Sequence, residues 1–380
     1  MKEDIVRVAV IGMTENKGGI ESVIMNIYRN IDREKVQFDF LLLHDATEIA
    51  FEDEILALGG RIFRIMYSQR ESYIKARRKL AQYFMEHPEV RAIHVHTNYP
   101  YAFPLKIAKE AGIPVRILHA HSSVMLYERN RGIGSLFKLV RNAIAYRQVS
   151  KYPNLYFSCS DLAAEATFKR KEYIWIKNGV ELEQFSYNEE IREEIRKENN
   201  INDVEIVIGV VGRICAGKNS IFTLNIFKEY LKINPNAKLV FVGDGEQRKD
   251  IEDEVKKSGL NQKVIITGII SDAYKWYQAF DVLILPSLYE GLPVVLVEGQ
   301  ASGLPCIASS SVTKQVKVTE LLKYMSNNEP ANKWALEIEK QLVKSYDRAK
   351  YKDEMKSASF DVKSMADEVV KYYTLDESSN

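Results

Sequence analysis

Short apolar runs alternate with longer amphipathic, charged segments along the whole chain. The apolar runs have the length of buried strands, and the segments between them repeat apolar residues at helical spacing. This alternation is typical of βα units that build parallel sheets, so we predict an α/β fold. The strands expected in the first half are Arg7–Ile11, Gln37–Leu43, Ala92–His96, Val115–Ala120 and Leu155–Cys159.

The same alternation starts again in the second half, which predicts a second doubly wound unit. Its expected strands and helices are Glu205–Val211, Lys238–Val242, Val264–Thr267, Val282–Leu285 and Pro305–Ala308, with Asn219–Lys232 and Gln247–Ser258 between them. A glycine turn and a highly charged run separate the two series, as at a domain boundary. We therefore predict domains at 1–181 and 182–359, followed by a final amphipathic helix at 360–375.

Composition and net charge exclude several classes of protein. With 46% hydrophobic and 28% charged residues among 380, the chain is an ordinary globular one. The 53 basic and 52 acidic residues leave a net charge of +1, which does not favour nucleic acid as a partner. No transmembrane helix or signal peptide is evident, so we expect a cytoplasmic protein. The three cysteines are far apart, which fits reduced thiols with a packing role.

Basic residues are concentrated between Arg61 and Lys151, a stretch that contains 17 basic residues and only 5 acidic ones. Two interpretations remain open for this stretch. The basic helices are solvated and pair with the more acidic second half, or they meet an anionic membrane surface. The candidate side chains for membrane contact are Lys75, Arg77, Arg78 and Lys79, and further along Arg129, Arg131, Lys138, Arg141 and Arg147.

Glycines and cations follow the first strand of each half. Gly18 and Gly19 lie at a strand-to-helix turn, where backbone can approach a ligand and a helix N-terminus attracts an anion. In the second half, Arg213 and Lys218 follow a strand and precede a helix, a combination suited to a diphosphate. The alternative for each is an ordinary turn. Neither loop has the Gly-x-Gly-x-x-Gly pattern of a dinucleotide site.

Two carboxylates, Glu290 and Glu298, stand eight residues apart in a Gly-, Pro- and Val-rich segment. Glu290 lies in a loop, and Glu298 lies within the helix that should begin near Pro293. A carboxylate among apolar residues is costly to bury without donors, and the hydroxyls of a ligand would supply them.

Two His-x-His pairs, His94 with His96 and His119 with His121, end consecutive strands. Alternate residues of a strand share one face, so either pair could chelate Zn²⁺. No cysteine or carboxylate cluster supplies a third ligand in the sequence, and we expect histidines beside a cleft rather than a metal site.

These residues together resemble the GT-B fold glycosyltransferases of family 4, the retaining enzymes that use nucleotide sugars. The likeness covers nearly the whole chain and rests most on Glu290-x7-Glu298 with its Glu-Gly-Leu-Pro sequence. It is supported, in the order the family uses, by Gly212-Arg213 with Lys218, Gly243-Asp-Gly245, Thr267-Gly268, Ala279-Phe-Asp281 and Ala301-Ser-Gly-Leu-Pro305. Residues Gly18–Glu21, His119–Ser122 and Asn178–Val180 are most similar to capsular and exopolysaccharide transferases. The chain departs from the family pattern at Thr313–Thr319.

The resemblance implies two Rossmann-like domains that face each other across a cleft, with the final helix packed back on the first domain. It also implies a role for each candidate residue. Catalysis would involve Glu290, His121, Arg213 and Lys218, and donor binding would involve Gly18, Gly19, Arg213, Lys218, Ile270, Gly291, Leu292 and Glu298. Arg213 and Lys218 would hold the diphosphate, so that no metal or other cofactor is required.

The resemblance thus implies transfer of a sugar from a nucleotide sugar, with UDP as the family's usual nucleotide, to a lipid-linked saccharide during capsular or exopolysaccharide synthesis. Weak contact of the first domain with the inner face of the membrane would accompany it. Two alternatives stay open. One is an epimerase or hydrolase of nucleotide sugars on the same fold, and the other is a non-catalytic partner that only binds a nucleotide sugar.

Overall fold

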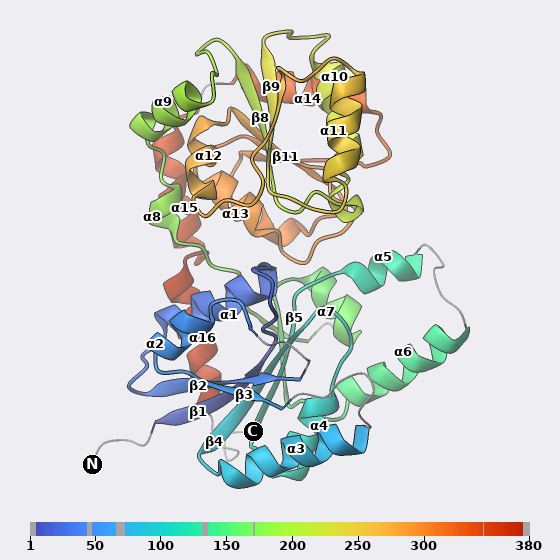
Figure 1. Cartoon of the computed structure of the whole chain (residues 1–380), viewed down its shortest axis with the longest axis vertical. Helices are drawn as coiled ribbons and strands as arrows, with labels where there is room; N and C mark the ends of the chain where they lie inside the picture. Colours follow the sequence, from blue (N-terminus) through green and yellow to red (C-terminus); the bar gives the residue numbers. More distant parts are fainter. Residues whose placement is uncertain are drawn as a thin grey trace. The chain divides into compact units, whose positions relative to one another are not determined.

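The computed structural model describes residues 5–43, 48–65, 73–130, 136–169, 172–344 and 346–374. The chain divides into two compact units, which are described separately below (Figure 1). Unit 1 comprises residues 1–179 together with 362–380, and unit 2 comprises residues 180–361. The divisions lie within two residues of the positions that the sequence suggested.

Unit 1 is built on a parallel sheet with the strand order β3-β2-β1-β4-β5-β6-β7. Its strands are β1 Val6–Ile11, β2 Val36–Leu42, β3 Arg61–Arg64, β4 Val90–Thr97, β5 Val115–Ala120, β6 Leu155–Ser158 and β7 Ile174–Trp175. The five predicted strands are confirmed. The prediction missed β3 and β7 because these edge strands are short and partly exposed, so they lack an apolar run.

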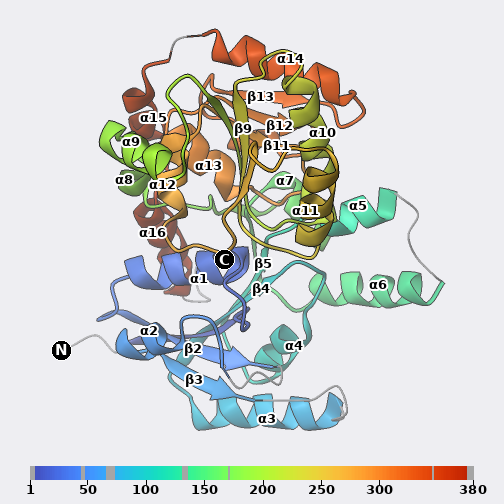
Figure 2. The same cartoon turned by 45° about the horizontal axis from the view of Figure 1, so that its top comes forward.

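Helices cover both faces of the unit 1 sheet (Figure 2). They are α1 Gly19–Asn30, α2 Glu52–Ala57, α3 Tyr73–Glu86, α4 Phe103–Glu110, α5 Val124–Asn130, α6 Leu136–Val149, α7 Asp161–Phe168 and α16 Val362–Tyr373. The final helix, α16, packs against α1 and places Met365, Val369 and Tyr373 in the core with Phe38 of β2. The end of the chain therefore completes the hydrophobic core of unit 1.

Unit 2 repeats the architecture with the strand order β10-β9-β8-β11-β12-β13, again all parallel. Its strands are β8 Ile206–Val211, β9 Ala237–Val242, β10 Val264–Ile266, β11 Val282–Leu285, β12 Cys306–Ser309 and β13 Leu322–Met325. Five of these follow the predicted ranges closely. The edge strand β13, in which one buried residue is followed by three half-buried ones with a lysine among them, was missed.

The helices of unit 2 surround this sheet. They are α8 Leu182–Phe185, α9 Glu189–Glu198, α10 Ser220–Tyr230, α11 Arg248–Lys257, α12 Ala273–Ala279, α13 Val294–Ala301, α14 Ala331–Leu342 and α15 Tyr351–Ser357, with one-turn 3₁₀ helices at Ala216–Lys218, Lys314–Val316 and Arg348–Lys350. The buried faces of α10, α11 and α14 form one core with β8, β9 and β11. The predicted α/β fold of two parallel, doubly wound sheets is thus confirmed.

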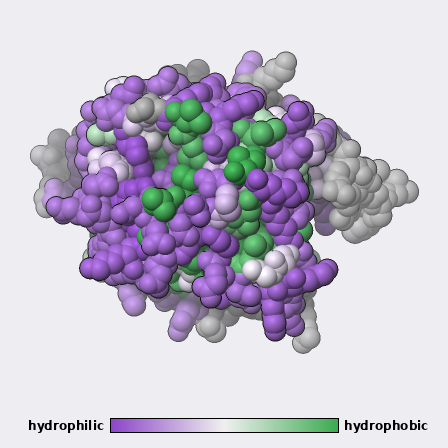
Figure 3. All heavy atoms as spheres, turned by 90° about the horizontal axis from the view of Figure 1, so that it is seen from above, coloured by the Kyte–Doolittle hydropathy of each residue, from purple (hydrophilic) through white to green (hydrophobic). Residues whose placement is uncertain are grey.

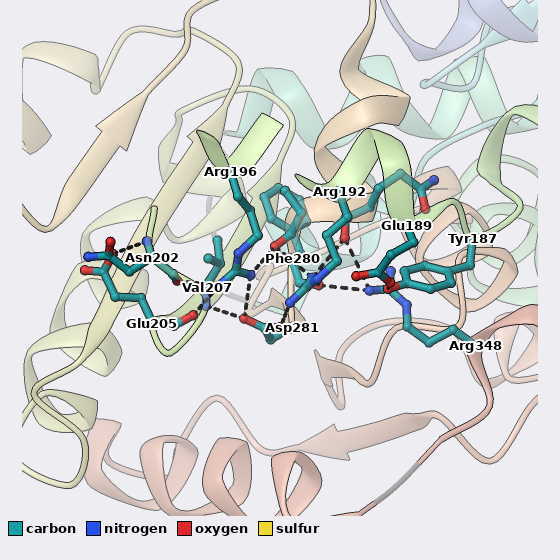
Figure 4. A network of polar contacts seen from close by, with 12 residues as sticks. Tyr187, Glu189, Arg192, Arg196, Asn202, Glu205, Val207, Phe280, Asp281 and Arg348 are labelled. Atoms are coloured by element: carbon teal, nitrogen blue, oxygen red, sulfur yellow. Dashed lines mark hydrogen bonds and ion pairs between the residues drawn. The ribbon is translucent and has the colours of Figure 1, made fainter. Parts of the chain in front are cut away.

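In each unit, one aspartate accepts hydrogen bonds from two arginines and so links neighbouring strands and helices. In unit 2, Asp281 accepts hydrogen bonds from Arg192 at 2.6 Å, Arg196 at 3.3 Å and the Val207 backbone at 2.7 Å (Figure 4). These bonds attach α9 to the start of β8 and β11. The Arg196 side chain is only 3% exposed. Removal of Asp281 from this anchor would therefore leave a buried positive charge without its partner, which destabilises the fold.

The corresponding anchor in unit 1 is the fully buried Asp39 of β2. Its carboxylate accepts bonds from Arg7 at 2.6 Å, from Arg61 at 2.5 Å and from the Tyr83 hydroxyl at 2.7 Å. Burial raises the pKa of the Tyr83 hydroxyl well above its usual value, so the hydroxyl remains a donor. The anchor links β1, β2, β3 and α3.

The surface is of the ordinary mixed kind on the face that Figure 3 shows, where hydrophilic residues surround separate groups of hydrophobic ones. Among the described residues, none of the helices has the length and apolar composition that crossing a bilayer demands. None of the three cysteines is paired in a disulfide, and Cys159 and Cys306 are buried while Cys215 is half-buried.

Candidate active site

The carboxyl ends of parallel strands meet at one edge of a sheet, where ligands of open α/β sheets bind. In unit 2, the candidate residues follow strands in this way. Arg213 and Lys218 come after β8, Ile270 after β10, and Glu290 after β11, while Glu298 is in α13, which comes next. Strand order places β10, β9, β8 and β11 consecutively, so the three candidate loops after β10, β8 and β11 share one edge.

Glycines allow the loops at this edge to approach each other closely. A Cβ atom on Gly243 would lie 2.1 Å from the carbonyl oxygen of Gly212, and one on Gly245 would lie 2.3 Å from that of Ile214. Gly243 also has a φ of +144°, which few other residues adopt. The Ile214 backbone donates to Asp244 at 2.9 Å. The β8 and β9 loops are therefore packed against each other backbone to backbone.

Lys218 and Glu290 form an ion pair at the centre of the edge, with Nζ 2.6 Å from Oε1. Both side chains are mostly buried, at 24% and 14% exposure. Two bonds bring their loops together: Leu288 N–H donates to Gly217 at 2.9 Å, and the Asn219 amide donates to Pro286 at 3.2 Å. Residues 72 positions apart in the chain are thus joined at one point.

Glu298 lies half-buried in α13 and accepts a short hydrogen bond from the Tyr277 hydroxyl of α12. Burial raises the pKa of Glu298 to about 7, against the opposing effects of Tyr277 and Lys218. Burial also raises the pKa of Tyr277 well above its usual value. The bond from Tyr277 therefore fixes the position of the carboxyl group. Its remaining lone pairs can accept hydrogen bonds from the hydroxyls of a ligand.

The other unit 2 candidates are more loosely placed. Arg213 is 71% exposed, and its Nε donates to Glu246 at 2.9 Å rather than to Lys218's partner. Ile270 is half-buried beyond β10, next to Ile269 at 87% exposure. Gly291 and Leu292 are buried between Glu290 and the start of α13. The structure brings Lys218 and Glu290 into contact, and it leaves Arg213 on the surface of the edge.

In unit 1, Gly18 and Gly19 begin α1, and Gly18 is its N-cap. A Cβ atom on Gly18 would lie 2.7 Å from the Glu21 carboxylate, so close approach explains this glycine. Glu21 is buried and accepts a bond from the Thr14 hydroxyl at 2.5 Å. Gly19 is exposed and has open space around it. The buried Glu21 was not among the residues singled out from the sequence.

The four histidines form one cluster at the carboxyl ends of β4 and β5, because the sheet pairs these strands side by side. His94 Nε2 lies 3.1 Å from His119 Nδ1, and His96 Nδ1 lies 2.9 Å from His121 Nε2. His94 Nδ1 also contacts the Tyr373 hydroxyl of α16 at 2.7 Å. Burial lowers the pKa of all four imidazoles, so they are neutral at pH 7.

Only His121 of this cluster is half-buried, since the other three are within the core. Nε2 of His121 contacts Nδ1 of His96, which leaves His121 Nδ1 as the remaining hydrogen-bonding atom of that ring. His121 is therefore the histidine of the cluster that is best placed to meet a ligand. The sequence shows two His-x-His pairs on consecutive strands, but the register that joins them into one cluster comes from the pairing of β4 with β5.

Tyr277 is a second residue that sequence reasoning missed. Its contact with Glu298 depends on how α12 packs against α13, and no spacing in the sequence indicates it.

Comparison with known proteins gives independent evidence on the family of this chain. Residues 17–184 match the model of Glycosyltransferase Family 4, and residues 191–356 match that of Glycosyl transferases group 1. A putative glycosyltransferase of Bacillus subtilis, EpsF, is 33% identical over 327 residues, which cover 84% of this chain and 83% of that protein.

Two further matches carry a substrate or a ligand in their names. An Escherichia coli enzyme named as a UDP-Gal:alpha-D-GlcNAc-diphosphoundecaprenol alpha-1,3-galactosyltransferase is 25% identical over 225 residues, 57% of each chain. The crystal structure of Anabaena HepE in complex with UDP superimposes with a TM-score of 0.77 over 97% of this chain and 99% of that one, at 16% identity. The latter likeness is one of fold.

Proposed function

Because this chain belongs to the family 4, group 1 glycosyltransferases, we propose that it moves a sugar from a UDP-sugar to a lipid-linked saccharide, with retention of configuration, in capsular or exopolysaccharide synthesis. The observation that carries the proposal is the Lys218–Glu290 contact of 2.6 Å at the carboxyl edge of the unit 2 sheet. It joins a phosphate-binding cation to a carboxylate that can bind sugar hydroxyls.

Each residue then has a task in unit 2. Lys218 and Arg213 bind the diphosphate, and Lys218 exchanges its bond with Glu290 for bonds to phosphate oxygens. Glu290 accepts hydrogen bonds from the sugar, with the Gly291 and Leu292 amides beside it. Glu298, fixed by Tyr277, accepts from the ribose, and Ile270 contacts the base. Unit 1 binds the acceptor, with His121 as its candidate catalytic residue and the Gly18–Gly19 turn as its candidate for donor binding.

The chemical step that we propose is the one that the family resemblance implies. The acceptor hydroxyl oxygen bonds to the anomeric carbon as the bond from that carbon to the phosphate oxygen breaks on the same face. The departing phosphate oxygen takes the proton of the acceptor. Negative charge grows on the diphosphate, and preorganised cations at Lys218 and Arg213 stabilise it. We therefore propose that transfer needs no metal ion.

The relatives support the choice of substrates. The name of the E. coli enzyme gives UDP-galactose as its donor and a diphosphoundecaprenol-linked sugar as its acceptor. HepE has been crystallised with UDP and with UDP-glucose. These substrates belong to those proteins, and we extend only their classes to this chain.

Product analysis tests the proposal. Purified protein in EDTA is incubated with one labelled UDP-sugar at a time and a short-chain polyprenyl-diphosphate saccharide. A product that is heavier by one sugar, with the anomeric configuration of the donor, is expected. Release of free sugar or of an epimerised donor without transfer would identify the epimerase or hydrolase alternative. Nucleotide binding without any product from the whole panel would favour the non-catalytic partner.

For the lipid-linked acceptor we also propose weak contact of unit 1 with an anionic membrane. On α3, Lys75 and Arg78 are exposed together with Ile74 at 61% and Met85 at 74%. Leu80, Tyr83 and Phe84 of that helix are buried in the core. Arg131 lies outside the described residues, as do the side chains of Arg129 and Lys138.

The helix α6 offers the same combination on the outside of unit 1 (Figure 1). Arg141 and Arg147 are exposed next to Val140 at 54% and Ile144 at 55% exposure. Basic residues gain about 1 kcal/mol each near anionic lipid, and the apolar ones can insert between headgroups.

Vesicle sedimentation tests this contact. The protein is expected to bind phosphatidylglycerol vesicles and not pure phosphatidylcholine ones, with binding that weakens as salt rises. Arg141→Gln with Arg147→Gln should weaken binding about tenfold. The matched control is Lys256→Gln with Lys257→Gln, a pair of exposed cations on α11 of unit 2. Equal loss in both double variants would contradict a membrane face on α6.

A further inference from the structure

Three imidazoles converge inside unit 1 from two neighbouring strands. His94 and His96 are alternate residues of β4 and stack with ring centroids 4.0 Å apart, and His119 of β5 is the register partner of His96. One nitrogen atom from each of the three lies within 4.8 Å of the others. All three side chains are buried, at 0%, 6% and 0% exposure.

Hydrogen bonds within the protein do not satisfy this cluster. Each neutral imidazole has one N–H and one lone pair. Tyr373, His94 and His119 form a chain of contacts at 2.7 and 3.1 Å, and His119 Nε2 is left at its end, buried and without a partner. Either direction of the hydrogen bonds leaves that atom unpaired. Three imidazoles are thus packed against one another in a sheet core, where buried polar side chains are uncommon and one nitrogen has no hydrogen-bond partner.

We propose that His94, His96 and His119 bind one divalent transition-metal ion of the zinc class within unit 1. Imidazole nitrogen is the preferred ligand of such ions, and three histidines with one open position form a known zinc ligand set. Zinc–nitrogen bonds of about 2.0–2.1 Å place ligands roughly 3.3 Å apart. His94 Nε2 and His119 Nδ1, 3.1 Å apart, are already close to this spacing, so His119 would bind the ion through Nδ1 and its buried Nε2 would carry the ring proton. A water molecule would supply the fourth ligand, so that His121, whose Nε2 lies 2.9 Å from His96 Nδ1, keeps the role proposed for it above.

The surroundings of His94 match those of a metal ligand. Its Nε2 faces the cluster, and its Nδ1 contacts the Tyr373 hydroxyl. A metal-bound histidine commonly uses its second nitrogen for such an outer hydrogen bond, which orients the ring. Because Tyr373 belongs to α16, an ion here would connect the last helix of the chain to β4 and β5. The ion would support the fold of unit 1, and it has no part in the transfer proposed for unit 2.

Cobalt(II) provides a test that involves neither nucleotide nor sugar. The full-length protein is dialysed against a chelator and then against buffer, and Co²⁺ is added while the visible spectrum is recorded. One Co²⁺ per chain, with the strong absorption of tetrahedral coordination and displacement by Zn²⁺, is expected. His119→Gln should weaken Zn²⁺ binding at least tenfold, and Tyr373→Phe about tenfold through its outer contact.

His87→Gln is the control, because His87 belongs to unit 1 but lies away from the cluster between Phe63 and Tyr83. It should bind Co²⁺ like the unchanged protein. If His119→Gln does not fold, Tyr373→Phe and a rise in unfolding temperature of the unchanged protein with Zn²⁺ still decide the question. Failure of the unchanged protein to bind Co²⁺ or Zn²⁺ would overturn the proposal, as would equal binding by His87→Gln, His119→Gln and Tyr373→Phe.

Discussion

The sheets of unit 1 and unit 2 share parallel strands and surrounding helices, yet the side chains at their carboxyl edges differ in kind. Unit 1 ends β4 and β5 in four neutral imidazoles, three of them buried. Unit 2 ends β8 and β11 in the Lys218–Glu290 ion pair, with glycines that let loops approach. The first edge suits a soft cation or uncharged hydroxyls, and the second suits a diphosphate.

The comparison shows that both sheets provide a binding edge at the carboxyl ends of their strands. A few side chains at that edge decide which ligand chemistry it suits. Both units use the same means of stabilisation, one aspartate with two arginines. Those anchors lie within the scaffold, and substitutions there should affect folding. Substitutions at the edges should affect binding and transfer. The predictions below test that division.

The largest effect is expected for Lys218→Met in unit 2. Without the ammonium group, the charge growing on the diphosphate loses its most buried cation, so kcat/KM for sugar transfer should fall about 10²- to 10³-fold. Lys232→Met, which removes an exposed lysine paired with Glu229, is the matched control and should leave transfer unchanged within about twofold. Steady-state kinetics would measure both. Equal losses in the two variants would contradict a special role for Lys218.

The anchors should show similar effects on stability in the two units. Asp39→Ala and Asp281→Ala each leave arginines without their partner, so each should lower the free energy of unfolding by about 3 kcal/mol. Urea denaturation measures this loss. Asp32→Ala and Asp272→Ala, at exposed ion pairs with Lys35 and Lys275, are controls and should cost less than about 1 kcal/mol. If only one of the two variants lost much less free energy of unfolding, the two anchors would not be equivalent.

Glu298→Gln should change the pH dependence of stability. The pKa of Glu298 in the folded chain is about 7, above its ordinary value of 4.5, so the folded state keeps a proton that the unfolded state releases. The stability that this proton contributes is present below about pH 4.5 and is lost as pH rises through 7. Glutamine does not titrate and can still accept from Tyr277, so the variant should gain on the order of 2 kcal/mol at pH 8.

Denaturation in urea at pH 5 and pH 8 measures this difference, with the exposed Glu252→Gln as control. The same Glu298→Gln substitution should weaken UDP binding, because its amide cannot accept from two ribose hydroxyls while it accepts from Tyr277. A gain in stability that accompanies a loss of binding would mark a functional residue. An unchanged pH profile would show that Glu298 is not kept neutral by burial.

The smallest effect is expected for Arg213→Met. Arg213 is 71% exposed and already pairs with Glu246, so its bond to phosphate competes with water and with that pair. The dissociation constant for UDP should rise about five- to tenfold, or about 1 kcal/mol. Calorimetry of UDP binding measures it, with Lys256→Met as control. A loss as large as that of Lys218→Met would show that Arg213 moves into the site when the ligand binds.

Central strands could be predicted from the sequence because their apolar runs are buried on both faces. The edge strands β3, β7 and β13 could not, since half-exposed residues such as Arg61 and Lys323 resemble a loop. The meeting of Lys218 and Glu290 could be anticipated, because both follow strands and parallel strands end together. The Tyr277–Glu298 bond depends on packing between two helices, and the histidine cluster depends on strand register. Neither is encoded in local spacing.

Calorimetric titration of UDP, GDP and ADP in EDTA tests the central claim, that the charged edge of unit 2 binds the nucleotide part of the donor without metal. We predict a dissociation constant for UDP on the order of micromolar, weaker binding of GDP and ADP, and loss of UDP binding in Lys218→Met and Glu298→Gln but not in Lys232→Met. The absence of UDP binding, or binding that both edge variants retain in full, would contradict the account.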